Sequence, residues 1–337
     1  MPSWIANIAR AEGGRISFER FMDLALYDPC HGYYTRQIST IGPSGDFATA
    51  LTIGDALVRS VANWARNEAR SLGFPSLNII ELGGGGGQLA RGILGTFRPW
   101  NRVQYQIVEI SKPLQQRQER ELRGRKIRWW ETIEAALDAV DGLAIIISNE
   151  FVDAFPCRRF ERAADGWREI LLSLDGDLWR EQLGERPETL ESSAFSIQCA
   201  ASQRVETLGS YRRWLMKMLR HLARGTLLTI DYGGSPAEIY HRKPHGTMRA
   251  FYRHERLEGM EIYLRAGRQD LTADVNFLDL RAWGEELGLT TAALVDQTEF
   301  IRRWRPPGST KRSKADDYLS NGKAMGNAIK VLHQRKV

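Results

Sequence analysis

A run of five glycines, Gly83 to Gly87, is the feature that most restricts how this chain can fold. It follows a short apolar segment, residues 77–82, and precedes a segment of helical spacing that begins at Gln88. Glycine adopts left-handed backbone conformations that other residues avoid, and it lets a ligand approach the backbone closely. The amide groups at the start of the following helix attract negative groups. This order of strand, turn and helix predicts a ligand-binding turn at the edge of a sheet.

The pattern on either side of the glycine run predicts a parallel sheet. Short apolar runs alternate with helical segments, as in strands joined by crossover helices. The predicted strands are residues 77–82, 103–109, 126–130, 143–148 and 226–232. Helices are predicted from Gln88, from Pro113 after the N-cap Ser111, from Ile133 after the N-cap Thr132, and over residues 18–28, 55–72, 203–223 and 277–287. A meander is predicted over residues 157–183, and an antiparallel edge pair over residues 289–295 and 328–332.

Composition restricts the class of protein. With 337 residues, 42% of them hydrophobic, the chain can bury a large core. Its three cysteines, Cys30, Cys157 and Cys199, lie far apart, which predicts a reducing compartment and no metal site. The longest apolar run, residues 143–147, is too short to span a membrane, and the N-terminus has no secretion pattern. These features predict a cytoplasmic protein.

The positive charge is modest but uneven. The formal net charge is +6, and basic residues gather in residues 117–128 and 302–314. Solvated surfaces are the favoured interpretation, and a basic docking surface for an acidic partner is the alternative. Nucleic acid is disfavoured as a partner because no aromatic reading motif accompanies these charges. The oligomeric state is left open, a homo-oligomer included.

Spacing separates three ligands that use glycine-rich turns. A dinucleotide fingerprint needs a third glycine three residues after the second, where this chain has Gln88 or Leu89. A phosphate loop needs Lys followed by Ser or Thr, which is absent here. The remaining pattern is E-x-G-x-G-x-G, formed by Glu81, Gly83, Gly85 and Gly87, which is typical of S-adenosylmethionine sites. Structural packing alone is the alternative interpretation.

Two acids that end later strands are predicted to complete the cofactor site. Glu109, with Ile110 beside it, ends the second strand, where a carboxylate can accept both ribose hydroxyls. Glu131 ends the third strand and can accept from the adenine amino group. The alternatives are an exposed strand-end carboxylate for Glu109 and a first-turn helix charge for Glu131.

The fourth strand delivers a polar segment to the same edge of the sheet. Asn149, Glu150 and Asp153 follow it, and both acids are predicted to lie on one side of a helical turn. Two carboxylates match the planar fork of a guanidinium group. The predicted catalytic residues are therefore Glu150, Asn149 and Asp153. The alternative gives Asn149 the role of an N-cap and both acids that of balancing the helix dipole.

The motifs together resemble the MidA family of methyltransferases, which includes the mitochondrial complex I assembly factor seven. The resemblance covers nearly the whole chain. The matching segments are residues 28–34, 45–50, 81–88, 108–118, 149–156, 231–233 and 270–275. The family usually has proline and arginine where this chain has Gly84 and Gly86.

The resemblance implies a fold, a cofactor and an acceptor. The expected fold is α/β, a Rossmann-like class I methyltransferase core with a doubly wound, mostly parallel seven-stranded sheet, a helical N-terminal extension and insertions. The expected cofactor is S-adenosylmethionine, covered by the loop Gly45, Asp46 and Phe47. In the mitochondrial member the acceptor is an arginine of a respiratory complex I subunit, so a protein substrate is expected here. Residues 1–75 would form the extension and covering loop, and residues 76–337 the cofactor domain, with insertions at about 157–225 and 233–274.

Two other functions stay open on the sequence alone. One is an assembly or binding factor that keeps the methyltransferase fold with a relaxed site. The other is a methyltransferase that acts on a small molecule.

Overall fold

The computed structural model describes residues 2–38, 54–97, 103–176, 178–307 and 328–337. The chain forms two compact units, each made of three stretches of sequence. Unit 1 comprises Met1–Ile38, Asp153–Arg213 and Gly233–Asp279, and unit 2 comprises Ser39–Val152, Trp214–Tyr232 and Leu280–Val337. The division into residues 1–75 and 76–337 stays a prediction.

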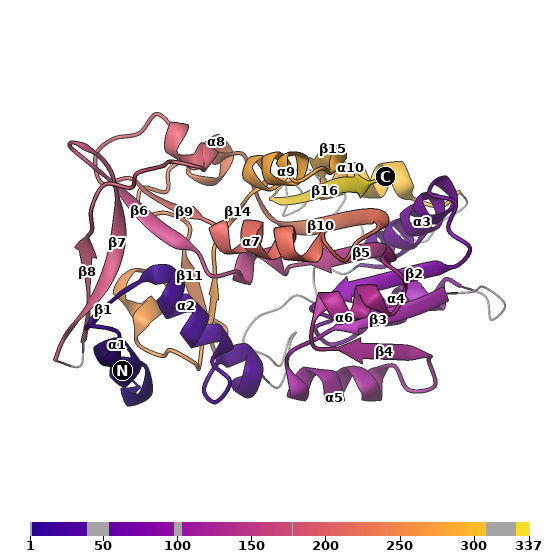
Figure 1. Cartoon of the computed structure of the whole chain (residues 1–337), viewed down its shortest axis with the longest axis horizontal. Coiled ribbons are helices and arrows are strands. Elements are labelled where there is room, and N and C mark those ends of the chain that lie inside the picture. The colour runs from indigo at the N-terminus through magenta and orange to yellow at the C-terminus, as the bar shows by residue number, and fades with distance from the viewer. Residues whose placement is uncertain (1, 39–53, 98–102, 177, 308–327) are drawn as a thin grey trace. The chain divides into compact units, whose positions relative to one another are not determined.

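Unit 2 is built on a mostly parallel sheet (Figure 1). The strand order is β15 (Thr290–Asp296), β16 (Ile329–Lys336), β10 (Arg224–Gly234), β5 (Leu143–Asn149), β2 (Leu77–Leu82), β3 (Val103–Val108) and β4 (Ile127–Trp130). The pairs from β10 to β4 are parallel, whereas β16 runs antiparallel to both β10 and β15. This path of seven strands confirms the predicted fold class. A short strand, β14 (Val275–Asn276), pairs with Gly233 and Gly234 at the end of β10.

The parallel strands form where the sequence predicts them, and the central strands β2, β5 and β10 are buried along most of their length. The bounds of β2, β3, β4, β5 and β10 agree with the predicted ranges to within two residues. β2 is buried along its whole length, and its residues are mostly apolar without a regular alternation, Asn78 and Glu81 being the polar exceptions.

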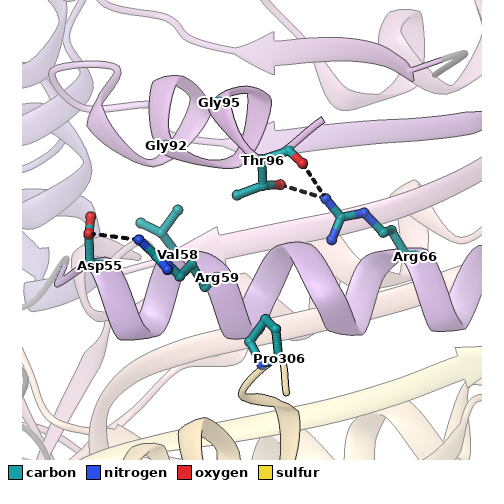
Figure 2. Close-up of a pocket in the computed structure, with 8 residues that line it drawn as sticks. All are labelled: Asp55, Val58, Arg59, Arg66, Gly92, Gly95, Thr96 and Pro306. Carbon is teal, nitrogen blue, oxygen red and sulfur yellow. Dashed lines mark hydrogen bonds and ion pairs between the residues drawn. The ribbon is translucent and has the colours of Figure 1, made fainter. Parts of the chain in front are cut away.

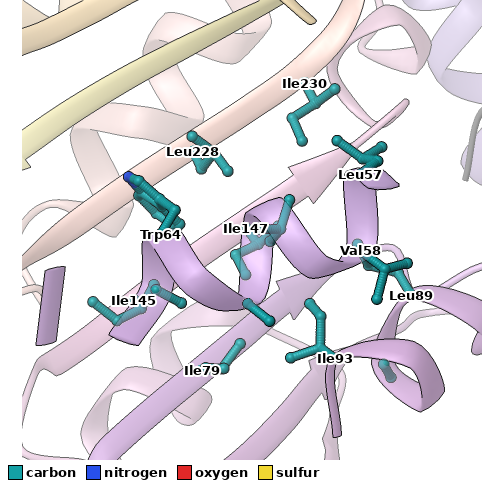
Figure 3. Packing of buried hydrophobic residues seen from close by; sticks show 14 of the residues in the cluster. Leu57, Val58, Trp64, Ile79, Leu89, Ile93, Ile145, Ile147, Leu228 and Ile230 are labelled. Atoms are coloured by element: carbon teal, nitrogen blue, oxygen red, sulfur yellow. The ribbon is translucent and has the colours of Figure 1, made fainter. Parts of the chain in front are cut away.

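One face of this sheet carries the large core of unit 2 (Figure 3). The helices α3 (Asp55–Ser71), α4 (Gln88–Gly95) and α10 (Gln297–Trp304) supply its helical side. Trp64 of α3 is fully buried against this face. The strand residues of the core include Ile79, Ile145, Ile147, Leu228 and Ile230, which alternate along β2, β5 and β10. Because side chains alternate across a strand, Glu81 lies on the same face as Ile79.

The crossover helices after β3 and β4 have the predicted N-caps, although the first of them begins at Lys112 rather than at Pro113. Ser111 caps α5 (Lys112–Glu121) by accepting the N–H of Leu114, and Thr132 caps α6 (Ile133–Asp138) by accepting the N–H of Ala135. The helix predicted over residues 277–287 is α9 (Phe277–Glu286). These caps fix the path of the chain as it leaves each strand.

Unit 1 consists of two antiparallel sheets and short helices. The first sheet has the order β1 (Arg15–Ser17), β7 (Gly166–Asp175), β6 (Arg158–Ala163), β9 (Arg204–Thr207), with β8 (Leu178–Leu183) also paired to β7. The second has the order β12 (Glu255–Leu257), β11 (Arg249–Tyr252), β13 (Asp270–Thr272). The helices are α1 (Ser3–Ala11), α2 (Phe18–Tyr27), which Ser17 caps as predicted, and α8 (Pro236–Ile239). The strands β6 to β8 confirm the predicted meander.

The long helix predicted over residues 203–223 is wrong at its start. Residues 204–207 form β9, which pairs antiparallel with residues 158–161 of β6. The helix α7 covers only Gly209–Met218. Pairing with a distant strand outweighs local helix propensity in this segment.

Candidate functional site

The glycine turn joins the end of β2 to the start of α4 in unit 2. Gly83, Gly85 and Gly87 have φ angles of 63°, 53° and 85°, in the left-handed region. Gly84 and Gly86 have no such angle. The three alternating glycines of the predicted spacing are therefore the ones whose backbone requires glycine. The other two stand at positions whose backbone any residue can adopt.

Side chains pack closely against the turn, so it has no room for larger residues. A Cβ on Gly83 would lie 2.9 Å from Cδ2 of Phe151, and one on Gly84 would lie 3.0 Å from Nε2 of Gln118. The N–H of Gly83 donates to the carbonyl of Val108 over 3.0 Å, which ties the turn to the end of β3. The turn is thus a fixed backbone surface to which a ligand can lie close.

Glu81 lies buried under the turn. Its Oε2 accepts the Tyr105 hydroxyl over 2.8 Å. Burial and the nearby carboxylate of Glu109 raise the pKa of Glu81 to about 8, although the Tyr105 hydrogen bond opposes this shift. At neutral pH Glu81 is therefore mostly protonated, and it supports the turn from the core side.

Glu109 stands directly after β3 with its carboxylate held on both oxygens. Oε1 accepts the N–H of Ser111 and Oε2 accepts from Nε2 of Gln118, each over 2.9 Å. Burial raises the pKa of Glu109 to about 7, against the effect of these hydrogen bonds. A carboxylate offers about four acceptor positions, so both oxygens keep capacity for further donors. Ile110, the next residue, is 41% exposed.

Gln118 is a residue of this site that the sequence prediction did not select. It is fully buried on α5, and its amide contacts Glu109, the carbonyl of Gly85 and the indole of Trp129. Its sequence signal is weak but present, because it follows Leu114 at four-residue spacing and these two are the buried residues of α5. A glutamine on the inward side of a polar helix indicates a specific polar partner.

Glu131 lies in a different environment from Glu81 and Glu109. It follows β4, is exposed, and forms an ion pair with Lys112 over 2.5 Å. The hydrogen bond from Lys112 lowers the pKa of Glu131. Its role toward an adenine ring stays a prediction.

Asn149 and Glu150 lie where β5 ends. Nδ2 of Asn149 donates to Oε1 of Glu150 over 3.4 Å, and the N–H of Glu150 donates to the carbonyl of Ile230 over 2.9 Å. The φ angle of Glu150 is 51°. The left-handed conformation costs about 1–2 kcal/mol for a residue with a side chain, so the surrounding bonds must hold it. Such strain is typical of functional sites.

Asp231 of β10 holds the segment that follows Glu150, and the sequence prediction did not select it either. Its Oδ2 accepts the N–H groups of Phe151 and Val152 over 3.1 and 2.8 Å, and its Oδ1 accepts the N–H of Tyr232 over 2.8 Å. Its side chain is fully buried. Charge-assisted bonds of this kind fix the backbone path on which the Glu150 side chain depends.

The helical turn predicted to carry Glu150 and Asp153 is wrong. The φ of Glu150 lies outside the helical region, and the short 3₁₀ helix η3 covers only Val152–Ala154. Asp153 is buried and belongs to unit 1, where its carbonyl accepts the N–H of Ala273 over 3.1 Å. The predicted covering loop, Gly45, Asp46 and Phe47, lies outside the described residues.

A separate pocket of about 410 Å³ lies beside α3 and α4 (Figure 2). Nη2 of Arg66 donates there to the carbonyl and the hydroxyl of Thr96. Its lining residues are Asp55, Val58, Arg59, Arg66, Gly92, Gly95, Thr96 and Pro306. None of these is a predicted site residue, so this pocket is distinct from the glycine turn.

Among the described residues, none of the helices has the length and hydrophobicity that a membrane-spanning helix requires.

Comparison with known families gives a match to most of this chain. Residues 60–295 match the family model described as S-adenosyl-L-methionine-dependent methyltransferase. The matched region contains the glycine turn, Glu109, Gln118, Glu150 and Asp231.

Curated relatives are similar over most of their length. The protein arginine methyltransferase NDUFAF7, mitochondrial, of Danio rerio is 30% identical over 302 residues, which are 80% of this chain and 68% of that protein. The protein of the same name from Xenopus tropicalis is 28% identical over 86% of this chain and 72% of its own length. These names contradict the predicted cytoplasmic location, because both relatives are called mitochondrial.

A solved structure has the same fold. A crystal structure from Burkholderia thailandensis, bound to S-adenosyl-homocysteine, superposes with a TM-score of 0.86 and 24% sequence identity. The alignment covers 99% of this chain and 91% of that one. A native crystal structure from the same organism gives a TM-score of 0.84.

Proposed function

Because the chain belongs to the family of S-adenosyl-L-methionine-dependent methyltransferases, we propose that it transfers a methyl group to an arginine side chain of a partner protein. Membership confirms the resemblance inferred from the motifs, and S-adenosylmethionine is the cofactor. The relatives from Danio rerio and Xenopus tropicalis are named protein arginine methyltransferases, which supports the acceptor. A respiratory complex I subunit, implied by the family resemblance, is the partner to examine first.

The cofactor residues in this proposal come from neighbouring strand ends of unit 2. Gly83, Gly85 and Gly87 would give the cofactor close access to the backbone, since a Cβ on Gly83 would collide with Phe151. Glu109 would accept the ribose hydroxyls on the acceptor positions that Ser111 and Gln118 leave. Bound S-adenosylmethionine supplies a methyl group on a positively charged sulfur.

Further residues keep their predicted cofactor roles as part of the proposal. Glu81 would support the turn from beneath, Ile110 would contact the adenosine, and Glu131 would accept from the adenine amino group.

The acceptor residues follow from the strained segment after β5. Glu150 would bind the guanidinium and orient one nitrogen for attack, with Asn149 fixing the Glu150 carboxylate. The observation that carries this assignment is the left-handed backbone of Glu150, held by the bonds of Ile230 and Asp231 around it.

Two substitutions at Glu150 test the proposal. Glu150→Gln should keep cofactor affinity while turnover falls by about 100-fold or more, because a neutral amide no longer pairs with the guanidinium. Glu150→Gly should lose turnover equally, yet the melting temperature should stay level or rise, because glycine adopts a φ of 51° without strain.

The measurement is mass spectrometry of arginine methylation in cells with and without the active protein, followed by transfer of labelled methyl groups to the identified partner. Label that appears only in small metabolites would contradict a protein acceptor. Unchanged turnover of Glu150→Gln would contradict the role of that residue.

A further inference from the structure

The buried amide of Gln118 contacts three neighbouring strand ends of unit 2. Its Nε2 donates to the carbonyl of Gly85 and to Oε2 of Glu109, each over 2.9 Å. Its Oε1 accepts the indole N–H of Trp129 over 2.9 Å. Gly85 follows β2, Glu109 follows β3 and Trp129 belongs to β4. The Gln118 side chain thus connects the glycine turn, β4 and Glu109, the residue that binds the ribose in the proposed function.

The chemistry of these partners fixes which way the amide points. An indole N–H can only donate, so it requires the oxygen end of the Gln118 amide. The NH₂ end must then face Gly85 and Glu109, whose oxygens can only accept when Glu109 is ionised. Both hydrogens of the amide are used, and water cannot replace a lost bond because Gln118 is fully buried.

Space around the turn is matched to this amide. A Cβ on Gly84 would lie only 3.0 Å from Nε2 of Gln118 and 2.8 Å from Cγ2 of Ile107. The missing side chain at position 84 therefore leaves the room in which Gln118 reaches the carbonyl of Gly85.

We propose that Gln118 is the positioning residue of the cofactor site. It orients the Glu109 carboxylate for the ribose and holds the glycine turn at Gly85, and it acts through these two residues. The inference rests on the proposed role of Glu109. Loss of the amide would leave the carbonyl of Gly85 and one Glu109 oxygen without this donor, so the site would bind the cofactor more weakly.

Two substitutions separate a positioning role from simple packing. Gln118→Met keeps the length and removes all three hydrogen bonds. Gln118→Glu keeps the shape and the bond from Trp129, but an ionised carboxylate would face the oxygens of Gly85 and Glu109 with no hydrogen to donate. Protonation restores one donor, so this variant should recover at low pH. The other titratable groups facing this region are Glu81 and Tyr105.

The test is calorimetry of the full-length protein with S-adenosyl-homocysteine at pH 6 and pH 8. Gln118→Met should weaken affinity about 10- to 100-fold at both pH values, as expected for unsatisfied buried groups. Relative to the wild type at the same pH, Gln118→Glu should show a similar loss at pH 8 and regain most of it at pH 6. Gln116→Glu, which makes the same change at an exposed position of α5, should stay within about twofold of the wild type.

The calorimetry distinguishes failure of the cofactor site from failure of the proposed role of Gln118. Failure of the wild-type protein to bind S-adenosyl-homocysteine would contradict the cofactor site itself. Wild-type binding together with unchanged affinity in Gln118→Met would overturn only the role of Gln118. If Gln118→Met does not fold, the pH comparison of Gln118→Glu decides, and a loss that is equal at both pH values would overturn the proposal.

Discussion

The carboxylate of Asp231 accepts the backbone N–H of Val152 over 2.8 Å. This bond links β10 to the segment that leaves β5, and the same oxygen also accepts the N–H of Phe151. The left-handed residue Glu150 lies directly before these two donors. The position of the proposed acceptor-binding carboxylate therefore depends on a residue from the neighbouring strand.

Asp231→Asn should lower kcat by about 10- to 100-fold. The NH₂ group of an asparagine cannot accept the hydrogen bonds that one carboxylate oxygen of Asp231 accepts, and each hydrogen bond to a charged group contributes about 1.5–3 kcal/mol. Affinity for S-adenosyl-homocysteine should stay within about threefold, since Glu109 and the glycine turn are untouched. Steady-state kinetics and calorimetry measure both quantities. Asp296→Asn, which loses an ion pair to Lys330 at the sheet edge, is the control. Equal losses in the two variants would contradict a specific role for Asp231.

Affinity for S-adenosylmethionine should rise by about tenfold between pH 6 and pH 8, because the pKa of Glu109 is raised to about 7 and the ionised form accepts the ribose hydroxyls. The direction of this pH dependence follows from linkage. The ribose hydroxyls donate to the Glu109 carboxylate and favour its ionised form, so cofactor binding releases a proton from Glu109. Calorimetry in buffers of different ionisation enthalpy measures this release. Glu109→Gln should remove the pH dependence along with most of the affinity, whereas Glu119→Gln, an exposed acid of α5, should keep it. A flat profile in the wild type would contradict the assignment.

Much of the fold follows from local sequence. β2 and β5, at the centre of the parallel sheet, are buried along nearly their whole length, so they appear in the sequence as mostly apolar runs, and polar or glycine residues follow their ends. The helix caps Ser111 and Thr132 are equally local, because each acts on an N–H three residues away. The segment 204–207 could not be predicted in this way. Its strand exists only because residues 158–161 lie beside it, which no local pattern shows.

The candidate site likewise contains residues that the local sequence reveals and residues that it does not. The glycine spacing and Glu109 are visible in the sequence because each follows a strand end, and parallel strands bring these ends to one edge. Gln118 and Asp231 differ, because their importance comes from the backbone groups and side chains that they contact from other elements. A glutamine in a polar helix has the same local appearance whether it faces solvent or a buried carboxylate.

Glu68 joins α3 to β16 through a buried charge cluster, which gives a prediction about stability. Its carboxylate accepts from Arg335 over 2.6 and 2.7 Å and lies 3.1 Å from Nε2 of His333. Burial would raise the pKa of Glu68, but these partners lower it to about 2. Glu68→Gln should therefore reduce the free energy of unfolding by about 3–5 kcal/mol at pH 7.

The pH dependence of this effect has a definite sign. The folded pKa of Glu68 is depressed, so its contribution is fully present above about pH 4.5 and is lost as pH falls toward 2. Urea unfolding followed by the tryptophan fluorescence of the protein measures it, and Trp64, one of its ten tryptophans, packs edge-on against His333. The difference between wild type and Glu68→Gln should shrink below pH 4, whereas Glu285→Gln, at an exposed position, should match the wild type throughout. A difference that stays constant down to pH 2 would exclude this origin.

Gly83→Ala should damage the cofactor site. The φ of 63° costs alanine about 1–2 kcal/mol. The new Cβ would also lie 2.9 Å from the ring of Phe151, which must move and would disturb the backbone that Asp231 holds. We expect S-adenosyl-homocysteine affinity to fall by more than about tenfold and kcat to fall with it. Gly95→Ala is the matched control, because its Cβ would meet no atom within 4 Å and alanine favours the helix. Equal behaviour of the two variants in calorimetry would show that the left-handed turn does not determine cofactor binding.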